Sequence, residues 1–460
     1  MKHPIHRALE NLSKKYGPIF TLQFGSRPVL VLSSPSAVED LFSKNDIIFA
    51  NKPQFSAGKH LSYNYTTLGT TPYGDHWRNL RRISTLEIFS TTKLNAFLGI
   101  RQEEVRSLLK NLFRNSRNGF AKVEMKSRLS EFSFNIVMRM VSGKRYFGAE
   151  VEDSKEAREF RLLIRDIFEL SGASNPGDFV PFLRWIDFGK VEKRMLRIQK
   201  KMDAFLQGLI DEKRNEDKQA SEQNGGKTKS MIDSMLGLQD SDPVYYSDEI
   251  IKGSILTMLG AGTDTSSVTI EWAMSLLLNH PKVLDKARAE IDTIVGDNRL
   301  ADEPDLSKLS YLQNIINETL RLFPAAPLLV PHESSDDSTI KGYDVARGTM
   351  LLVNAWAIHR DPKVWEDPTS FWPERFEGGE NQAYRLIPFG IGRRSCPGAG
   401  LANRVVALAL AALIQCFDWV RIGDDLVDMS EGQGLTVPKS KPLEAVCRPR
   451  DMMVNVLLEL

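Results

Sequence analysis

Residues 248–280 carry the feature that most constrains the fold. With Ser247 or Asp248 as its capping residue, a helical pattern runs to His280-Pro281, where the proline ends it. A helix of roughly thirty residues is far longer than the three or four turns that are usual in globular proteins. We therefore predict that this helix crosses the whole body of the protein.

The remaining pattern favours a mainly α fold with small antiparallel β-sheets. Residues 18–33 alternate and read as a hairpin, whereas residues 34–45, which begin with a capping serine, and 90–115 have helical periodicity. Short strand-like stretches return at 327–334, 348–359 and 452–460. The order of these elements excludes an alternating βαβ fold.

Composition limits the classes of function. The 460 residues contain 60 basic and 59 acidic side chains. The chain therefore lacks the strongly basic composition that would indicate a nucleic-acid partner. Three cysteines argue against a disulfide framework, and no apolar run approaches the ~18 residues of a membrane span. We expect one domain over 1–460, with a charged surface loop at 211–230 that contains no aromatic residue.

One cysteine stands in an unusual context, in the stretch "PFGIGRRSCPGAGLANRVV" at 388–406. Glycines before and after Cys396 let the backbone approach a ligand closely, and the arginines and the following helix favour a thiolate. A zinc site needs further ligands nearby, and a cysteine protease gives no reason for the glycines. A buried, inert thiol remains the ordinary alternative. A single thiolate surrounded by backbone N–H groups suits the axial ligand of a haem iron.

The stretch "FGIGRRSCPG" at 389–398 resembles the haem-binding pattern of the cytochrome P450 superfamily. The resemblance implies the P450 fold and haem b (iron protoporphyrin IX), with Cys396 as the iron ligand. It places Phe389, Gly390 and Gly398 at the cofactor.

Two further stretches match the superfamily in its order. In "NETLRLFP" (317–324), Glu318 and Arg321 are three residues apart and so face each other on one helix, which taken alone indicates an ordinary surface ion pair. With Arg375 of "FWPERF" (371–376) they resemble the structural P450 triad. In "GDHWRNLRRI" (74–83), Trp77 and Arg81 match the residues that bind a haem propionate. The resemblance gives the same role to Arg394 and His332, although a solvent-facing His332 is the alternative.

The stretch "AGTDTS" at 261–266 weakens the long helix. Ala261 and Gly262 have almost no side chain, so a flat ligand could reach the backbone, and the Thr265 hydroxyl competes for the carbonyl of Ala261. A helix kinked for packing is the alternative. The resemblance makes Asp264 and Thr265 the catalytic pair that delivers protons during oxygen activation.

By the same resemblance the chain is a monooxygenase that takes electrons from NADPH through cytochrome P450 reductase. It inserts oxygen from O2 into a hydrophobic plant metabolite, a flavonoid, a phenylpropanoid or lignan, or a terpenoid. The stretches "FSAGKHLSYNYTT" (55–67), "PHESSDD" and "GLTVPKSKPLEAVCRPR" resemble plant microsomal members that include isoflavone hydroxylases and lignan-modifying enzymes. We expect a monomer on the cytosolic face of the endoplasmic reticulum, with an apolar anchor ahead of Met1. Exposed Arg78, Arg82 and Arg393 could dock the reductase, although solvated surface charges are the default.

The resemblance implies that the substrate pocket is lined by residues 56–72, the segment around 165–185, residues 256–261 and 325–330, and the turn at 434–436. The mostly apolar side chains expected there are Leu256, Ala261, Ala325, Ala326, Leu328, Leu329, Leu435 and Thr436. Three other activities stay open: oxidative ring closure or phenol coupling, peroxide rearrangement without reductase, and non-catalytic haem binding.

Overall fold

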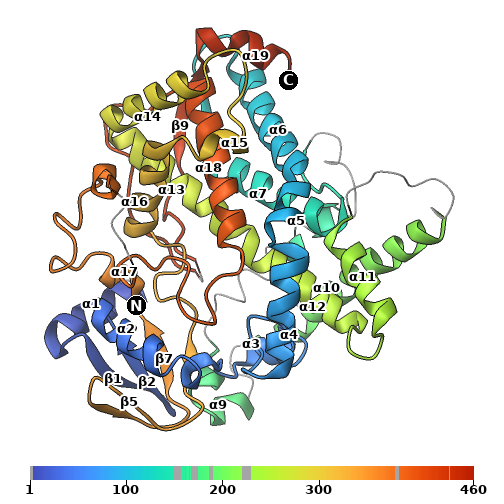
Figure 1. The fold of residues 1–460 in the computed structure, drawn as a ribbon, viewed down its shortest axis with the longest axis vertical. Helices are drawn as coiled ribbons and strands as arrows, with labels where there is room; N and C mark the ends of the chain where they lie inside the picture. The colour runs from blue at the N-terminus through green and yellow to red at the C-terminus, as the bar shows by residue number, and fades with distance from the viewer. Residues whose placement is uncertain are drawn as a thin grey trace.

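The computed structural model describes residues 4–148, 157–160, 162–164, 166, 175–185, 190–219, 229–378, 383–434 and 436–460. Helices dominate it, and the small sheets lie at its margins (Figure 1). The sheet that contains β1, β2 and β7 lies with α1 and α2 at one end of the molecule, and the long helices form the body beside it (Figure 1). The mainly α class predicted from the sequence is confirmed.

The helices alternate between long core members and short connecting turns. The α-helices are α1 Ile5–Tyr16, α2 Pro35–Lys44, α3 Ser56–Leu61, α4 Asp75–Ile83, α5 Thr91–Ala96, α6 Leu98–Ser116, α7 Met125–Ser142, α9 Phe182–Trp185, α10 Val191–Gln219, α11 Met231–Ser241, α12 Asp248–Gly262, α13 Asp264–Asn279, α14 Pro281–Ile294, α15 Glu303–Leu306, α16 Ser310–Leu322, α17 Ala355–Ile358, α18 Ala399–Cys416 and α19 Val454–Leu458. The short helices are η1 Ile48–Ala50, the π-helix η2 Ser84–Ile88, η3 Pro176–Asp178, η5 Pro373–Phe376 and η6 Asp451–Met453.

Three small sheets bring together strands that are distant in the sequence. Their strands are β1 Ile19–Phe24, β2 Arg27–Leu32, β3 Ala121–Glu124, β4 His332–Glu333, β5 Ser338–Ile340, β6 Tyr343–Val345, β7 Met350–Val353, β8 Phe417–Val420 and β9 Glu444–Pro449. The orders are β1-β2-β7-β4, β3-β9-β8 and β5-β6. The predicted hairpin is β1–β2, with Phe24 opposite Arg27. One pair departs from the expected antiparallel pattern: β2 and β7 run parallel, with Val29 opposite Met350.

The long helix of the prediction is present but is interrupted. α12 ends at Gly262 and α13 starts at Asp264, and Thr263 between them stays in the right-handed helical region but is distorted, with φ −92° and ψ −63°. The Thr265 hydroxyl donates to the carbonyl of Ala261 at 2.8 Å. A side-chain hydroxyl that bonds to a backbone carbonyl competes with the backbone N–H that would otherwise bond to it in the helix. This contact is the one that the sequence predicts as the cause of a local opening.

The core lies where α13 and α18 pass through the middle of the molecule (Figure 1). Among the described helices α18 is long and apolar enough to cross a membrane, with mean hydropathy 1.6 over 18 residues, but 72% of those residues are buried inside the protein. Every residue from Val405 to Cys416 is buried. The apolar side chains of α18 therefore pack in the core of the protein.

Three predicted elements are wrong in part. The strand-like stretch 348–359 forms β7 only to Val353, and α17 follows within it. The expected surface loop at 211–230 begins as helix, because α10 continues to Gln219; residues 220–228 lie outside the described residues. The final strand-like stretch, 452–460, forms the end of η6 and then α19. Its buried residues Met453 and Leu457 are four apart, which is a helical spacing. The β-branched and apolar residues of the stretch favour a strand instead and hide this spacing.

Candidate active site

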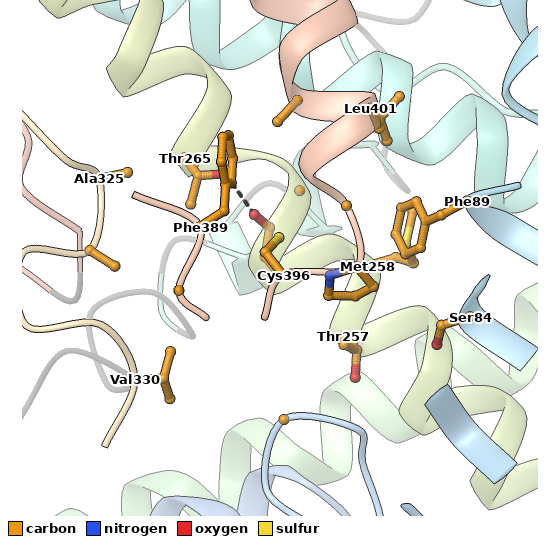
Figure 2. Close-up of a pocket in the computed structure, with 18 of the residues that line it drawn as sticks. Ser84, Phe89, Thr257, Met258, Thr265, Ala325, Val330, Phe389, Cys396 and Leu401 are labelled. Carbon is orange, nitrogen blue, oxygen red and sulfur yellow. Dashed lines mark hydrogen bonds between the residues drawn. The ribbon is translucent and has the colours of Figure 1, made fainter. Parts of the chain in front are cut away.

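A cavity of about 360 Å³ lies at the centre of the molecule. Its walls come from α4, α7, α12, α13, α16 and α18 and from the loops at 68–69, 325–332 and 388–398. Figure 2 shows Cys396 in its midst, with Thr265, Met258, Phe89 and Phe389 around it. The lining is mostly apolar, and no aspartate or glutamate belongs to the described residues that form it.

The loop before α18 aims the thiol of Cys396 into this cavity. Gly390 and Gly392 both have φ +71°, a left-handed conformation that residues with a Cβ rarely adopt. The N–H of Cys396 donates to the carbonyl of Phe389 at 2.8 Å and closes the turn. The sequence therefore needs these two glycines to bring the sulfur to the surface of the cavity.

Opposing effects act on the Cys396 thiol. Burial is the largest effect and raises the pKa of the thiol overall, although the N–H groups of Gly398 and Ala399 and the charge of Arg81 partly offset it by favouring the thiolate. These N–H groups stand at the start of α18, where the first four helical donors have no partner within the helix. The sulfur thus has the surroundings of a ligand that becomes a thiolate when a cation arrives.

Positive and hydrogen-bond-donating side chains converge on one edge of the cavity. Arg394 donates to the carbonyls of Ala50, Leu68 and Thr71 and stacks on Trp77, its guanidinium 4.5 Å from the ring. Burial and the neighbouring Arg81 lower the pKa of Arg394 to about 10. Arg81 itself donates to the carbonyl of Ser395 at 2.6 Å, which fixes α4 to the cysteine loop.

His332 completes this edge and is not a solvent-facing residue. It is 7% exposed, and its Nδ1 lies 2.7 Å from the carbonyl of Phe49. Burial, with the charges of Lys52 and Arg394, lowers the pKa of His332 to about 3. Trp77 is also buried, and its indole N–H has no hydrogen-bond partner.

These residues fit iron protoporphyrin IX. An orphaned indole N–H and several cations without an acidic partner demand an anion, because unpaired buried polar groups are costly. The two carboxylates of the porphyrin supply one, the flat apolar cavity accommodates the ring, and Cys396 offers the metal ligand. Trp77, Arg81 and Arg394 would hold the carboxylates, whereas the predicted role of His332 would need a protonated ring, because its Nδ1–H is already bonded to Phe49.

The α12–α13 break forms another wall. The hydrogen bond from Thr265 to Ala261 is the dashed line in Figure 2, and Thr265, Ala261 and Gly262 all line the cavity. Gly262 also has a packing role, since a Cβ there would lie 3.1 Å from a methyl group of Val137 on α7. Asp264 does not line the cavity, because its carboxylate accepts a hydrogen bond from the Thr436 hydroxyl.

Behind the cavity, Glu318 and Arg321 form a pair that is fully buried, not a surface pair. Arg321 donates to both carboxylate oxygens of Glu318, at 2.7 and 2.8 Å, and to the carbonyls of His359, Pro368 and Ser370. Arg375 donates to Glu318 at 3.1 Å. The expected triad is therefore assembled, and it joins α16 to the segment around η5.

The expected substrate-pocket residues are only partly brought together. Ala261, Ala325, Ala326 and Leu329 line the cavity, with Leu68 and Gly69 from the expected 56–72 segment. Leu256 and Leu328 do not: Leu256 packs among buried residues of α7, α10 and α11, and Leu328 packs against β2 and β7. Thr436 bonds to Asp264 instead. Leu435, residue 165 and residues 167–174 lie outside the described residues, and the described part of 165–185 does not line the cavity.

The sequence prediction missed several lining residues. Lys52, Ser84 and Phe89 all border the cavity. Thr257 and Met258 also line it, and both belong to the expected segment from Leu256 to Ala261. Lys52 gives no signal in the sequence, since a lone lysine is almost always exposed.

The cytochrome P450 family model matches residues 1–444, which is nearly the whole chain. The chain belongs to the cytochrome P450 family. It is thus an oxidoreductase of the P450 monooxygenase type, and the family implies a haem iron cofactor, O2, a small substrate and an electron-transfer partner. The expected superfamily resemblance and the enzyme class are confirmed.

Several plant P450s are similar over almost their full length. Cytochrome P450 81Q32 of Catharanthus roseus is 61% identical, with 99% of this chain and 89% of the relative covered. The (+)-piperitol/(+)-sesamin synthase CYP81Q2 of Sesamum radiatum is 53% identical over 100% of this chain and 89% of its own. An isoflavone 3'-hydroxylase of Medicago truncatula is 53% identical, with 97% and 89% covered.

Solved structures agree with the fold. A zebra fish cytochrome P450 with progesterone superposes with TM-score 0.83 at 25% identity, covering 97% of this chain and 100% of the other. The P450 fold predicted from the cysteine loop and its partner motifs is confirmed.

Proposed function

We propose that this P450 inserts one oxygen atom from O2 into a neutral, hydrophobic plant secondary metabolite. The candidates are a flavonoid, a phenylpropanoid or lignan, and a terpenoid. The observation that carries the proposal is the composition of the central cavity. The Cys396 thiol lies beside an edge of buried cationic and hydrogen-bond-donating side chains, which we call the donor edge. None of the described lining residues is a carboxylate, and the rest of the lining is mostly apolar. An anionic substrate group would compete with the cofactor for the same cations, so a neutral substrate fits better.

The bound haem would supply oxygen activation, with the Cys396 thiolate donating electron density that favours O–O cleavage. The residues of this chain do the rest. Cys396 holds the metal, the donor edge orients the ring, and the apolar walls exclude water and position the substrate. Thr265 places a hydroxyl on the cavity wall, and Asp264 would have to leave Thr436 to carry a proton there.

Electrons would come from NADPH through cytochrome P450 reductase. The proposed docking face on α4 and the cysteine loop is partly neutralised: Arg78 pairs with Asp75, and Arg393 pairs with Asp46 at 3.2 Å. Arg82 donates to the uncharged Asn79 and so keeps its charge available. We infer a monomer on the cytosolic face of the endoplasmic reticulum membrane, as expected for plant microsomal P450s.

A second candidate is oxidative ring closure or phenol coupling. It is favoured by the 53% identity to a protein named (+)-piperitol/(+)-sesamin synthase, which equals the identity to the isoflavone 3'-hydroxylase. The same cavity would serve both reactions, since each starts by oxidising a hydrophobic aromatic compound.

The deciding experiment is a binding-spectrum screen of flavonoids, lignans and other phenylpropanoids, and terpenoids. Hits are then incubated with reductase, NADPH and ¹⁸O2. Hydroxylation gives products that carry one ¹⁸O atom, whereas ring closure or coupling gives products that lack two hydrogens and carry no label. A protein that binds haem but consumes no NADPH with any hit would overturn the proposal. Turnover supported by organic hydroperoxide alone would indicate peroxide rearrangement.

A further inference from the structure

Lys52 is a buried lysine at the cavity, and no recognised P450 pattern in the sequence includes it. It is 7% exposed and lines the cavity. Lysine is almost never fully buried unless it is paired with an acid, because an ammonium group is strongly hydrated in water. The burial of Lys52 therefore needs an explanation.

Within the described part of the chain, the side chain of Lys52 is held by backbone carbonyls alone. Its Nζ donates to the carbonyls of Pro331 at 3.0 Å and Val330 at 3.3 Å. The backbone beside it is also fixed, since the Glu333 N–H donates to the Asn51 carbonyl at 3.0 Å. An ammonium has three N–H donors, so one remains after these two bonds.

The charges around Lys52 do not compensate it. Arg394, Arg81 and His332 face the same cavity, and none of the described lining residues is acidic. Glu333, which follows the two acceptor carbonyls in the sequence, pairs with Arg27 at 3.3 Å and does not line the cavity. Burial and the charge of Arg394 together lower the pKa of Lys52 well below its usual range. The burial of the Lys52 ammonium group therefore destabilises the protein unless an anion enters the cavity and compensates its charge.

A comparison within the molecule strengthens this point. Lys252 on α12 is as buried as Lys52, at 6% exposed, but its Nζ lies 2.6 Å from the carboxylate of Asp203. Lys252 is thus an ordinary buried lysine with an acid of its own. Lys52 has the position of a ligand-binding group.

We propose that Lys52 is an additional donor to the carboxylate edge of the bound porphyrin, beside Trp77, Arg81 and Arg394. The inference rests on the proposed function, because it requires haem in the cavity. Lys52 would donate a hydrogen bond to the carboxylate, which the neutral form of His332 cannot do. The Nδ1–H of His332 donates to Phe49, so a neutral ring has no second N–H to offer.

The test measures how fast ferric haem leaves the holoprotein for an excess of apomyoglobin. Loss of one charge-assisted hydrogen bond predicts release about ten-fold faster for Lys52→Met and Lys52→Gln. Lys52→Arg keeps the charge and the donors and is expected to restore most of the retention. The matched control is Lys252→Met, which removes a buried lysine away from the cavity and is expected to leave the release rate unchanged.

A second measurement separates a contact with the cofactor from a merely structural role. The propionate bending band in the resonance Raman spectrum should shift in Lys52→Gln, because this band responds to hydrogen bonds at the carboxylates. Unchanged release and an unchanged band in Lys52→Gln would overturn the inference, as would equal losses in Lys252→Met. A wild-type protein that purifies without haem would instead refute the proposed function.

Discussion

At the scale of single residues, the cavity depends on the sulfur of Cys396. The left-handed turns at Gly390 and Gly392 and the N–H groups at the start of α18 all act to present this one atom. The two other cysteines, Cys416 and Cys447, are buried, and burial raises the pKa of each thiol to about 12. They are therefore inert thiols that cannot replace Cys396.

Cys396→Ala is expected to abolish the red-shifted carbon-monoxide absorption band of the reduced protein, because no other thiolate reaches the cavity. Difference spectroscopy of the purified variant measures this. Cys416→Ala serves as the control and should keep the band. Persistence of the band in Cys396→Ala would refute the assigned ligand.

Thr265→Ala removes the hydroxyl that bonds to Ala261 at the helix break. We expect peroxide release per NADPH consumed to rise several-fold, because protons would no longer be delivered in step with electrons. Thr265→Ser keeps the hydroxyl and should resemble the wild type. An unchanged peroxide fraction in Thr265→Ala would count against the proton-delivery role.

The roles of residues that belong to a recognisable motif could be predicted from the sequence, whereas the roles of residues outside any motif could not. Cys396, Arg81 and Glu318 sit in motifs whose spacing has a physical cause, such as a helix face or a tight loop. The roles of Lys52 and of the Asp264–Thr436 contact depend on segments far apart in the chain. No local pattern records which distant carbonyl or hydroxyl a side chain will meet.

At the scale of elements, the ion pair of α16 holds the segment behind the cysteine loop. Glu318 is fully buried and accepts hydrogen bonds from Arg321, Arg375 and the N–H of Trp372. Removing it leaves the Arg321 guanidinium buried without its counter-charge. Such a loss typically costs about 3–5 kcal/mol.

Glu318→Ala is therefore expected to yield little haem-loaded protein, as measured by the ratio of haem absorbance to protein absorbance after purification. The control is Glu377→Ala, which removes the exposed partner of Lys286 and should cost less than about 1 kcal/mol. Normal haem loading of Glu318→Ala would contradict the structural role.

Element boundaries were predictable where local chemistry sets them. The Ser34 hydroxyl accepts a hydrogen bond from the Ala37 N–H and starts α2, as its position in the sequence indicates. The strand expected at 452–460 failed because tertiary packing uses Met453 and Leu457 on one helical face. The parallel β2–β7 pair was also beyond prediction, since it joins residues more than 300 apart.

At the scale of the whole molecule, α1 is locked to the C-terminal region. Glu431 is almost completely buried and accepts hydrogen bonds from His6, Arg7 and Trp356 at 2.7–2.9 Å. Burial alone would raise the pKa of Glu431, but the bonds from His6 and Arg7 outweigh it and bring the pKa to about 2.

Glu431→Gln is expected to lower the free energy of unfolding by roughly 3 kcal/mol at pH 7. Because the folded pKa lies below its ordinary value of 4.5, the wild-type advantage is complete above that pH and shrinks as the pH falls towards 2. Urea titrations of both proteins at pH 7 and pH 3.5 measure it. An equal difference at the two pH values would show that the charge of Glu431 is not responsible.

Arg394 has a consequence for engineering. One side chain both faces the cofactor edge and ties down the carbonyls of Ala50, Leu68 and Thr71. Substrate preference and cofactor retention are therefore not separate traits in this stretch. Libraries that randomise residues 50–71 to broaden the range of accepted compounds will also return poorly pigmented clones, and colour should be scored before turnover.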